Sequence, residues 1–96
     1  MAFGVKLAAN VAEMVGKLHP DLKQELRVAI REISANPYLG KALQEDLQGF
    51  LSFRFKRYRI ICRVEDTEQT VTIYMFGHRR DVYELFSELV RQQNQP

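Results

Sequence analysis

The sequence has one cysteine, no long apolar run, and no repeats, linkers or low-complexity segments. Because Cys62 has no second cysteine to pair with, an internal disulfide and a multi-cysteine metal site are both excluded. No apolar run approaches the roughly 18 residues that a membrane-spanning helix needs. The first residues, MAFGVKLAANVAEM, show no basic lead, long apolar block or cleavage signal, so we expect no export signal. A reducing cytoplasm is therefore the expected location, with no membrane partner.

What the chain does contain is the composition of an ordinary globular domain. Of its 96 residues, 46% are hydrophobic and 27% are charged, so we expect a single domain over residues 1–96. The net charge is only +2, but seven of the eight basic side chains in residues 51–96 are arginines. Arginine presents a rigid fork of donors that suits phosphate. The charge pattern therefore predicts one local site for an anionic partner.

The first third of the chain predicts a strand followed by two helices. Residues 3–8 alternate between apolar and small or polar side chains, as a strand does. Asn10 opens an Asn-x-x-Glu capping box, and the helix that follows should end at His19. Pro20 suits the first turn of a second helix, which should end before Pro37.

From residue 50 the apolar period changes to two, after a connecting loop predicted over residues 37–49. Three strands of an antiparallel meander are predicted, over residues 50–55, 58–65 and 70–76. A last helix should begin at Asp81, and residues 92–96 should form a frayed tail. The predicted order is β-α-α-β-β-β-α, an α+β fold. It consists of a small antiparallel meander sheet with the helices packed on one face and a basic face left open.

The basic face follows from the pairing of two strands. A tight hairpin at Lys56-Arg57 places Arg54 opposite Arg59, and cross-strand partners share one face of a sheet. The side chains predicted to face the helices are Phe53, Phe55, Tyr58, Ile60, Cys62, Val64, Val71, Ile73 and Met75. The same alternation places Tyr74 and Phe76 on the arginine face.

Two opposed arginines destabilise a sheet by roughly 0.2–1 kcal/mol. A bound anion would offset this repulsion, and neighbouring aromatic side chains favour an anion that carries bases. The alternative is that the cations only form a solvent-exposed charged face and protect edge strands from aggregation.

A second basic cluster follows the last strand, in the segment GHRRDVY at residues 77–83. It places His78, Arg79 and Arg80 where a strand becomes a helix, with Tyr83 in the first helical turn. The free backbone N–H groups of such a junction can bind phosphate.

Four short motifs occur in a defined order along the chain. They are Asn36-Pro37, Leu47-Gln48-Gly49, Arg54-x-x-x-Tyr58-Arg59-Ile60-Ile61 and Gly77-His78-Arg79-x-Asp81-Val82-Tyr83. Together with the order of elements, they resemble the RelE/ParE superfamily of toxins from bacterial toxin–antitoxin systems, and specifically its RelE-like branch. The resemblance covers about residues 3 to 90.

The resemblance implies a toxin that inhibits translation by cleaving mRNA in the decoding site of the ribosome. In that family the 2′-hydroxyl attacks the adjacent phosphodiester and leaves a 2′,3′-cyclic phosphate and a 5′-hydroxyl. The catalytic candidates carried over by position are Arg54, Arg59, Arg79 and Tyr83. His78 is a further candidate because the ordinary pKa of histidine suits proton transfer. The candidates for RNA binding are Lys56, Arg57, Arg63, Arg80, Tyr74 and Phe76.

The implied partners are the ribosome, mRNA and a cognate acidic antitoxin, with no cofactor and no metal. Two features depart from the family pattern. Ser52 stands where a lysine can occur, so one possible general base is missing, and Lys56-Arg57 replaces the commoner Gly-Asp of the hairpin. Two alternatives stay open: a ParE-like inhibitor of DNA gyrase on the same fold, and a non-toxic relative that only binds its antitoxin.

Overall fold

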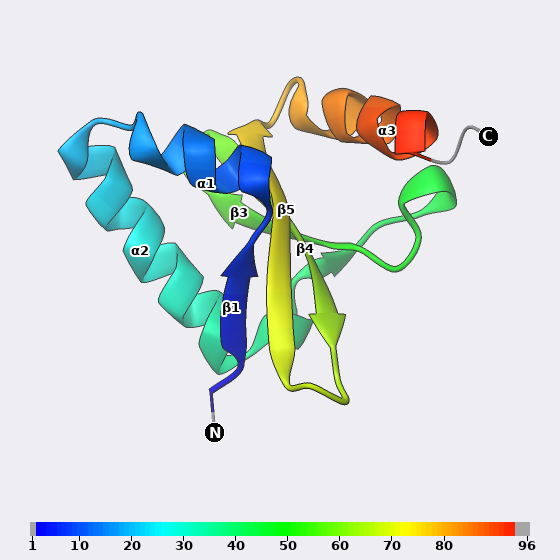
Figure 1. The fold of residues 1–96 in the computed structure, drawn as a ribbon, viewed down its shortest axis with the longest axis horizontal. Helices are drawn as coiled ribbons and strands as arrows, with labels where there is room; N and C mark the ends of the chain where they lie inside the picture. The colour runs from blue at the N-terminus through cyan, green and yellow to red at the C-terminus, as the bar shows by residue number, and fades with distance from the viewer. Residues whose placement is uncertain (1, 94–96) are drawn as a thin grey trace.

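The protein, described over residues 2–93 by a computed structural model, is built on a five-stranded sheet with the order β1-β5-β4-β3-β2 (Figure 1). The strands are β1 (Gly4–Leu7), β2 (Lys41–Ala42), β3 (Leu51–Phe55), β4 (Tyr58–Glu65) and β5 (Thr70–His78). Neighbouring strands from β2 to β5 run antiparallel, whereas β1 pairs with β5 in parallel. The predicted meander is therefore confirmed, and a parallel edge strand extends it into a mixed sheet.

Three helices accompany the sheet, in the order that the sequence predicts. They are α1 (Ala9–Gly16), α2 (Pro20–Ala35) and α3 (Val82–Gln93), and two 3₁₀ turns, η1 (Pro37–Leu39) and η2 (Glu45–Leu47), flank β2. The α+β fold class is confirmed. The segment predicted as a loop contains β2 and both 3₁₀ turns, and α3 includes Gln92 and Gln93 of the expected tail. Residues 94–96 of that tail lie outside the described residues. None of the described helices is long and apolar enough to span a membrane.

The α1–α2 hairpin covers one face of the sheet, which we call the helix face (Figure 1). Val11 of α1 and Leu26 and Ile33 of α2 pack there against buried strand residues. Those strand residues are Phe55, Ile60, Cys62, Val71, Ile73 and Phe76. The predicted apolar stripe of β3 and β4 is confirmed, because Phe53, Tyr58 and Val64 also pack against this cluster.

The prediction placed all the helices on one face of the sheet, and this is wrong for α3. That helix does not join α1 and α2 on the helix face. Figure 1 shows α3 apart from that pair, beyond the end of β5. Val82 and Phe86 of α3 form a second cluster with Ile61, Met75 and the η2 residue Leu47. Since Ile61 alternates with the helix-face residues Ile60 and Cys62, this cluster lies on the opposite face of the sheet.

A β-bulge in β5 explains why two predicted side-chain directions are wrong. Ile61 pairs with Met75 and Cys62 pairs with Ile73, so Tyr74 is an extra residue without a partner in β4. One extra residue reverses the alternation of the side chains that follow it. Met75 therefore joins α3 in the second cluster, and Phe76 turns to the helix face.

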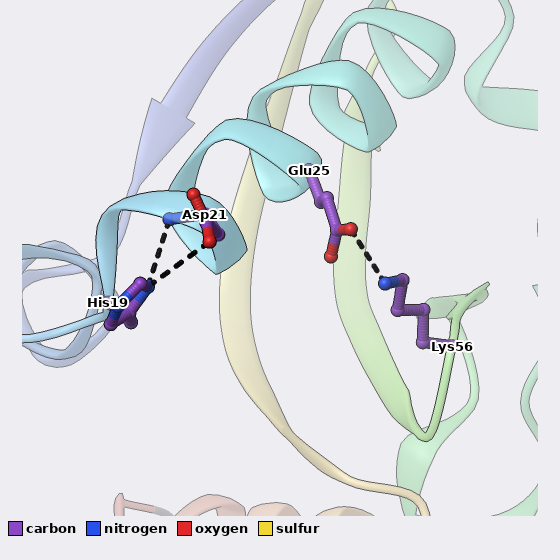
Figure 2. Close-up of polar contacts among 4 residues, drawn as sticks. All are labelled: His19, Asp21, Glu25 and Lys56. Carbon is purple, nitrogen blue, oxygen red and sulfur yellow. Dashed lines mark hydrogen bonds and ion pairs between the residues drawn. The ribbon is translucent and has the colours of Figure 1, made fainter.

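The helix starts agree with the sequence at α2 and not at α1. At α2, His19 is the N-cap: its Nδ1 accepts a hydrogen bond of 3.2 Å from the Asp21 backbone N–H (Figure 2). The predicted capping box of α1 is wrong, because that helix starts at Ala9, after Ala8, with no side-chain cap. Asn10 instead donates from Nδ2 to the carbonyl oxygen of the bulged residue Tyr74, at 3.3 Å.

Candidate functional site

Arg54 and Arg59 are direct cross-strand partners in the register of β3 and β4. The predicted juxtaposition of the two arginines is therefore confirmed, on the face opposite the α1–α2 hairpin, which we call the arginine face. Arg54 is exposed and Arg59 is half-buried, with its Nη1 donating to the Tyr58 carbonyl oxygen at 3.1 Å. On its other side Arg59 pairs with Gly77 of β5, which places no side chain over it. The pair is thus left accessible to an anion.

Tyr83 reaches the arginine face from the first turn of α3. Its Oη lies 2.8 Å from the hydroxyl oxygen of Ser52, which is on β3. Ser52 precedes Arg54 by two residues, so the two side chains point to the same face of the strand. The fold therefore brings three of the predicted catalytic residues, Arg54, Arg59 and Tyr83, to one face.

The fourth, Arg79, lies beside the β3–β4 hairpin in the turn after β5. Its backbone N–H donates to the carbonyl oxygen of Arg57 at 2.9 Å, which fixes this turn against the hairpin. A hollow of about 550 Å³ opens there, lined by Arg57, His78, Arg79, Arg80 and Asp81. Three of its five lining residues are arginines and one is a histidine, whereas only Asp81 carries a carboxylate. This hollow suits a polyanion.

His78 is separated from the arginine pair by the plane of the sheet. It pairs with Tyr58, which belongs to the helix face, and the two rings lie 4.9 Å apart between centroids. The structure therefore brings His78 to the basic hollow but not beside Arg54 and Arg59.

The predicted RNA-binding residues are only partly available to a partner. Lys56 is held towards α2 by an ion pair of 2.6 Å with Glu25 (Figure 2). It also occupies the left-handed backbone region with φ 54°, where glycine is easier to place. The Nε atom of Arg63 lies 3.8 Å from Oε1 of Glu65. Its Cζ atom lies over the Phe50 ring, 5.8 Å from the ring centroid.

Of the two aromatic candidates, Phe76 is buried and Tyr74 is half-buried. Phe76 is only 2% exposed and lies on the helix face, so its predicted place on the arginine face is wrong. Tyr74 does lie on the side of α3, but it packs edge-on against Phe50 at 5.5 Å and contacts Phe86. From its position the Phe76 ring is not available for stacking on a base, whereas the Tyr74 ring is partly accessible.

A second hollow, of about 710 Å³, lies along α3 and has the opposite charge character. Tyr83 lines it together with three carboxylates, Asp81, Glu84 and Glu88, and with Arg91. Since these carboxylates repel phosphate, the arginine face is the side of Tyr83 that suits a nucleic acid.

Across the described part of the chain the potential metal ligands are dispersed, and the Cys62 thiol is buried. Over residues 2–93, no three His, Cys, Asp or Glu side chains gather as a metal site requires. Burial raises the pKa of the Cys62 thiol to about 12, so this residue is not a nucleophile at neutral pH. It lies in the core, on the helix face, as its alternation with Ile60 and Val64 predicts.

In the sequence, Ser52 stands out only because it occupies a position where a lysine can occur in the family. Its hydrogen bond to Tyr83 joins residues 31 positions apart. No local pattern predicts such a contact. The one available signal was a polar residue between Leu51 and Phe53 on a strand next to a core.

Comparison with known proteins identifies the family of this chain. A family model described as the ParE toxin of the type II toxin–antitoxin system parDE matches residues 6–83. Toxin RelG of Mycobacterium tuberculosis (strain ATCC 25618 / H37Rv) is 32% identical over 85 residues, which cover 86% of this chain and 98% of RelG.

Solved structures agree with these matches. The M. tuberculosis toxin–antitoxin complex RelBE2 contains a chain with a TM-score of 0.73 and 28% identity, covering 84% of this chain and 95% of that one. A mutant of the E. coli toxin RelE in the free state has a TM-score of 0.75 at 18% identity, covering 96% and 98%, a likeness that shows the fold alone. Because the family model spans most of the sequence and RelG is similar over nearly its whole length, the chain belongs to the RelE/ParE superfamily of type II toxin–antitoxin toxins.

Proposed function

We propose that this toxin is an endoribonuclease that cleaves mRNA in the decoding site of the ribosome and so inhibits translation. The observation that carries the proposal is the Arg54–Arg59 pair on the same face as Tyr83. Similarity to RelG and to the RelBE2 toxin supports the RelE-like branch of the superfamily over the ParE-like branch.

The proposed reaction is an attack of the 2′-oxygen of a nucleotide on its own 3′-phosphate. The 2′-hydroxyl loses its proton, and a bond forms between phosphorus and the 2′-oxygen. The bond between phosphorus and the 5′-oxygen of the next nucleotide breaks. The leaving 5′-oxygen takes up a proton, which gives a 2′,3′-cyclic phosphate and a 5′-hydroxyl. Two proton transfers and the growing negative charge on phosphorus are therefore what the protein must manage.

Arg54 and Arg59 suit the stabilisation of charge on the phosphoryl oxygens, because guanidinium groups stay charged at any physiological pH. Arg79, at the basic hollow, would hold the phosphate chain on one side of the cleaved bond. Tyr83 offers a hydroxyl for proton transfer and a ring on which the nucleotide can stack. An enzyme with so few acid–base groups would depend on the ribosome to orient its substrate.

The partner that restrains such a toxin is proposed to be a cognate acidic antitoxin. The RelBE2 structure is one of a toxin–antitoxin complex. On this chain an antitoxin with carboxylates would pair with the arginines of the arginine face and keep that face from the ribosome.

A ParE-like action on DNA gyrase is the second candidate function. The observation that favours it is the family model, which is described by the ParE toxin. Against it stand the paired arginines and the basic hollow, which suit a nucleic acid more than a protein surface.

The two candidates are separated by one pair of assays. Purified ribosomes are programmed with a defined mRNA and given stoichiometric toxin, and the 5′ ends of the fragments are mapped. We expect cuts inside the ribosome-bound codon, with 5′-hydroxyl ends that a polynucleotide kinase labels directly. Intact message, together with gyrase-dependent breaks in supercoiled DNA, would replace this proposal by the gyrase one.

A further inference from the structure

We propose that Ser52 is a positioning residue that holds the Tyr83 hydroxyl on the arginine face. The proposal rests on the endoribonuclease function above, and it assigns a role to a serine that occupies the place of a possible catalytic lysine. Ser52 would not touch the RNA itself. It would act through Tyr83.

The first support is the burial of Ser52. Its exposure is 5%, and it is the one buried polar residue among residues 2–93. The large majority of buried hydroxyl groups in proteins have a hydrogen-bond partner. The partner here is Tyr83 Oη at 2.8 Å, a normal distance for a bond between two hydroxyls.

The second support is where this bond lies in the fold. Ser52 is the second residue of β3, and it is paired with Ile61 of β4 on one side and with Lys41 of β2 on the other. A side chain on such a strand has little freedom to move. Tyr83, in contrast, lies in the first turn of α3, which follows a turn. The Ser52 hydroxyl therefore fixes the end of the Tyr83 side chain against a rigid strand, two residues before Arg54.

The third support is the second surface that the Tyr83 side chain borders. Its side chain also lines the acidic hollow along α3, beside Asp81 and Glu84. Without Ser52, the phenol would be free to turn towards that hollow, where phosphate is repelled. Ser52 thus selects the side of α3 on which the hydroxyl meets the substrate. When Ser52 donates its proton to Tyr83 Oη, the phenol proton is left free to be given away.

A double-mutant cycle tests the proposal. Single-turnover mRNA cleavage on programmed ribosomes is measured for Ser52→Ala, Tyr83→Phe and the combination, with Ser87→Ala on α3 as the matched serine control. We expect Ser52→Ala to slow cleavage by roughly ten- to hundredfold, the scale of a misplaced catalytic group. In the Tyr83→Phe background, the same change should have no further effect. An unchanged rate in Ser52→Ala, or an equal loss in both backgrounds, would overturn the assignment.

A second measurement does not depend on activity. The protein is labelled with 3-fluorotyrosine, and the Tyr83 fluorine signal is identified as the one lost in Tyr83→Phe. We expect this signal to shift and broaden in Ser52→Ala while the other tyrosine signals stay in place. An unchanged Tyr83 signal means that Ser52 does not position it. If the wild type cuts no mRNA, the proposed function fails, and the fluorine signal still decides whether Ser52 holds Tyr83.

Discussion

The two faces of the sheet differ in how completely helices cover them. On the helix face, α1 and α2 bury a continuous apolar layer, in which Ile60, Cys62 and Val71 are 0% exposed. On the arginine face, α3 covers only the part around Ile61 and Met75 and leaves Arg54 exposed. The candidate site lies on the part that α3 does not cover.

The difference shows how a small protein can carry an unfavourable charge cluster. Burying one isoleucine side chain contributes about 1.5–3 kcal/mol, whereas two opposed arginines cost roughly 0.2–1 kcal/mol. A single buried residue of the helix face therefore more than offsets the repulsion on the other face. The complete core stabilises the fold, and the incomplete one leaves room for a partner.

The largest expected effect comes from truncating one isoleucine on each face. Ile60 and Ile61 are neighbours, and each is 0% exposed. We expect both Ile60→Ala and Ile61→Ala to lower the free energy of unfolding by about 2–5 kcal/mol in urea denaturation. Only Ile61→Ala should also slow mRNA cleavage by the protein that remains folded, because Ile61 packs against α3, which carries Tyr83. Equal losses of cleavage would mean that the two faces are not distinct.

High pH tests whether the helix face excludes water. The pKa of Cys62 is raised from 9.0 to about 12 by burial, so above pH 9 the unfolded chain loses the thiol proton and the folded one keeps it. Stability should then fall as pH rises. Between pH 9 and 10 the wild type should lose about 1 kcal/mol more than Cys62→Ala. Parallel pH profiles of the two proteins would show that the thiol is reached by water.

The smallest expected effect compares two neighbouring cations of the hairpin. Lys56 is paired with Glu25 on the side of α2, whereas Arg57 lines the basic hollow. Measured against salt, RNA affinity of Arg57→Gln should show a slope reduced by about 0.7, the share of one phosphate contact to a single strand. The matched change Lys56→Gln should leave the slope unaltered. A reversed ranking would place the RNA path on the helix face.

The sequence predicted those features that depend on alternation over short distances. The limits of β4 are as predicted, and the two-residue hairpin fixed Arg54 opposite Arg59. It also predicted the start of α2, since proline at the first helical position follows a capping residue.

What could not be predicted depends on contacts between distant residues. The bulge at Tyr74 leaves no mark on the apolar period, yet it moves Met75 and Phe76 to opposite faces from those expected. The position of α3 was signalled by Ile61, an apolar residue between Arg59 and Arg63, but that signal names no helix. The Ser52–Tyr83 bond depends on that position in turn.

The central claim is that charge stabilisation by the arginine pair is required for the reaction. The most direct measurement is single-turnover mRNA cleavage on programmed ribosomes by Arg59→Ala, beside Arg27→Ala, an exposed arginine of α2. We expect Arg59→Ala to lower the rate by about 10²–10³-fold, as the loss of one charge-stabilising donor does, with an unchanged melting temperature. Arg27→Ala should cleave as the wild type does. Equal rates for the two variants would contradict the account.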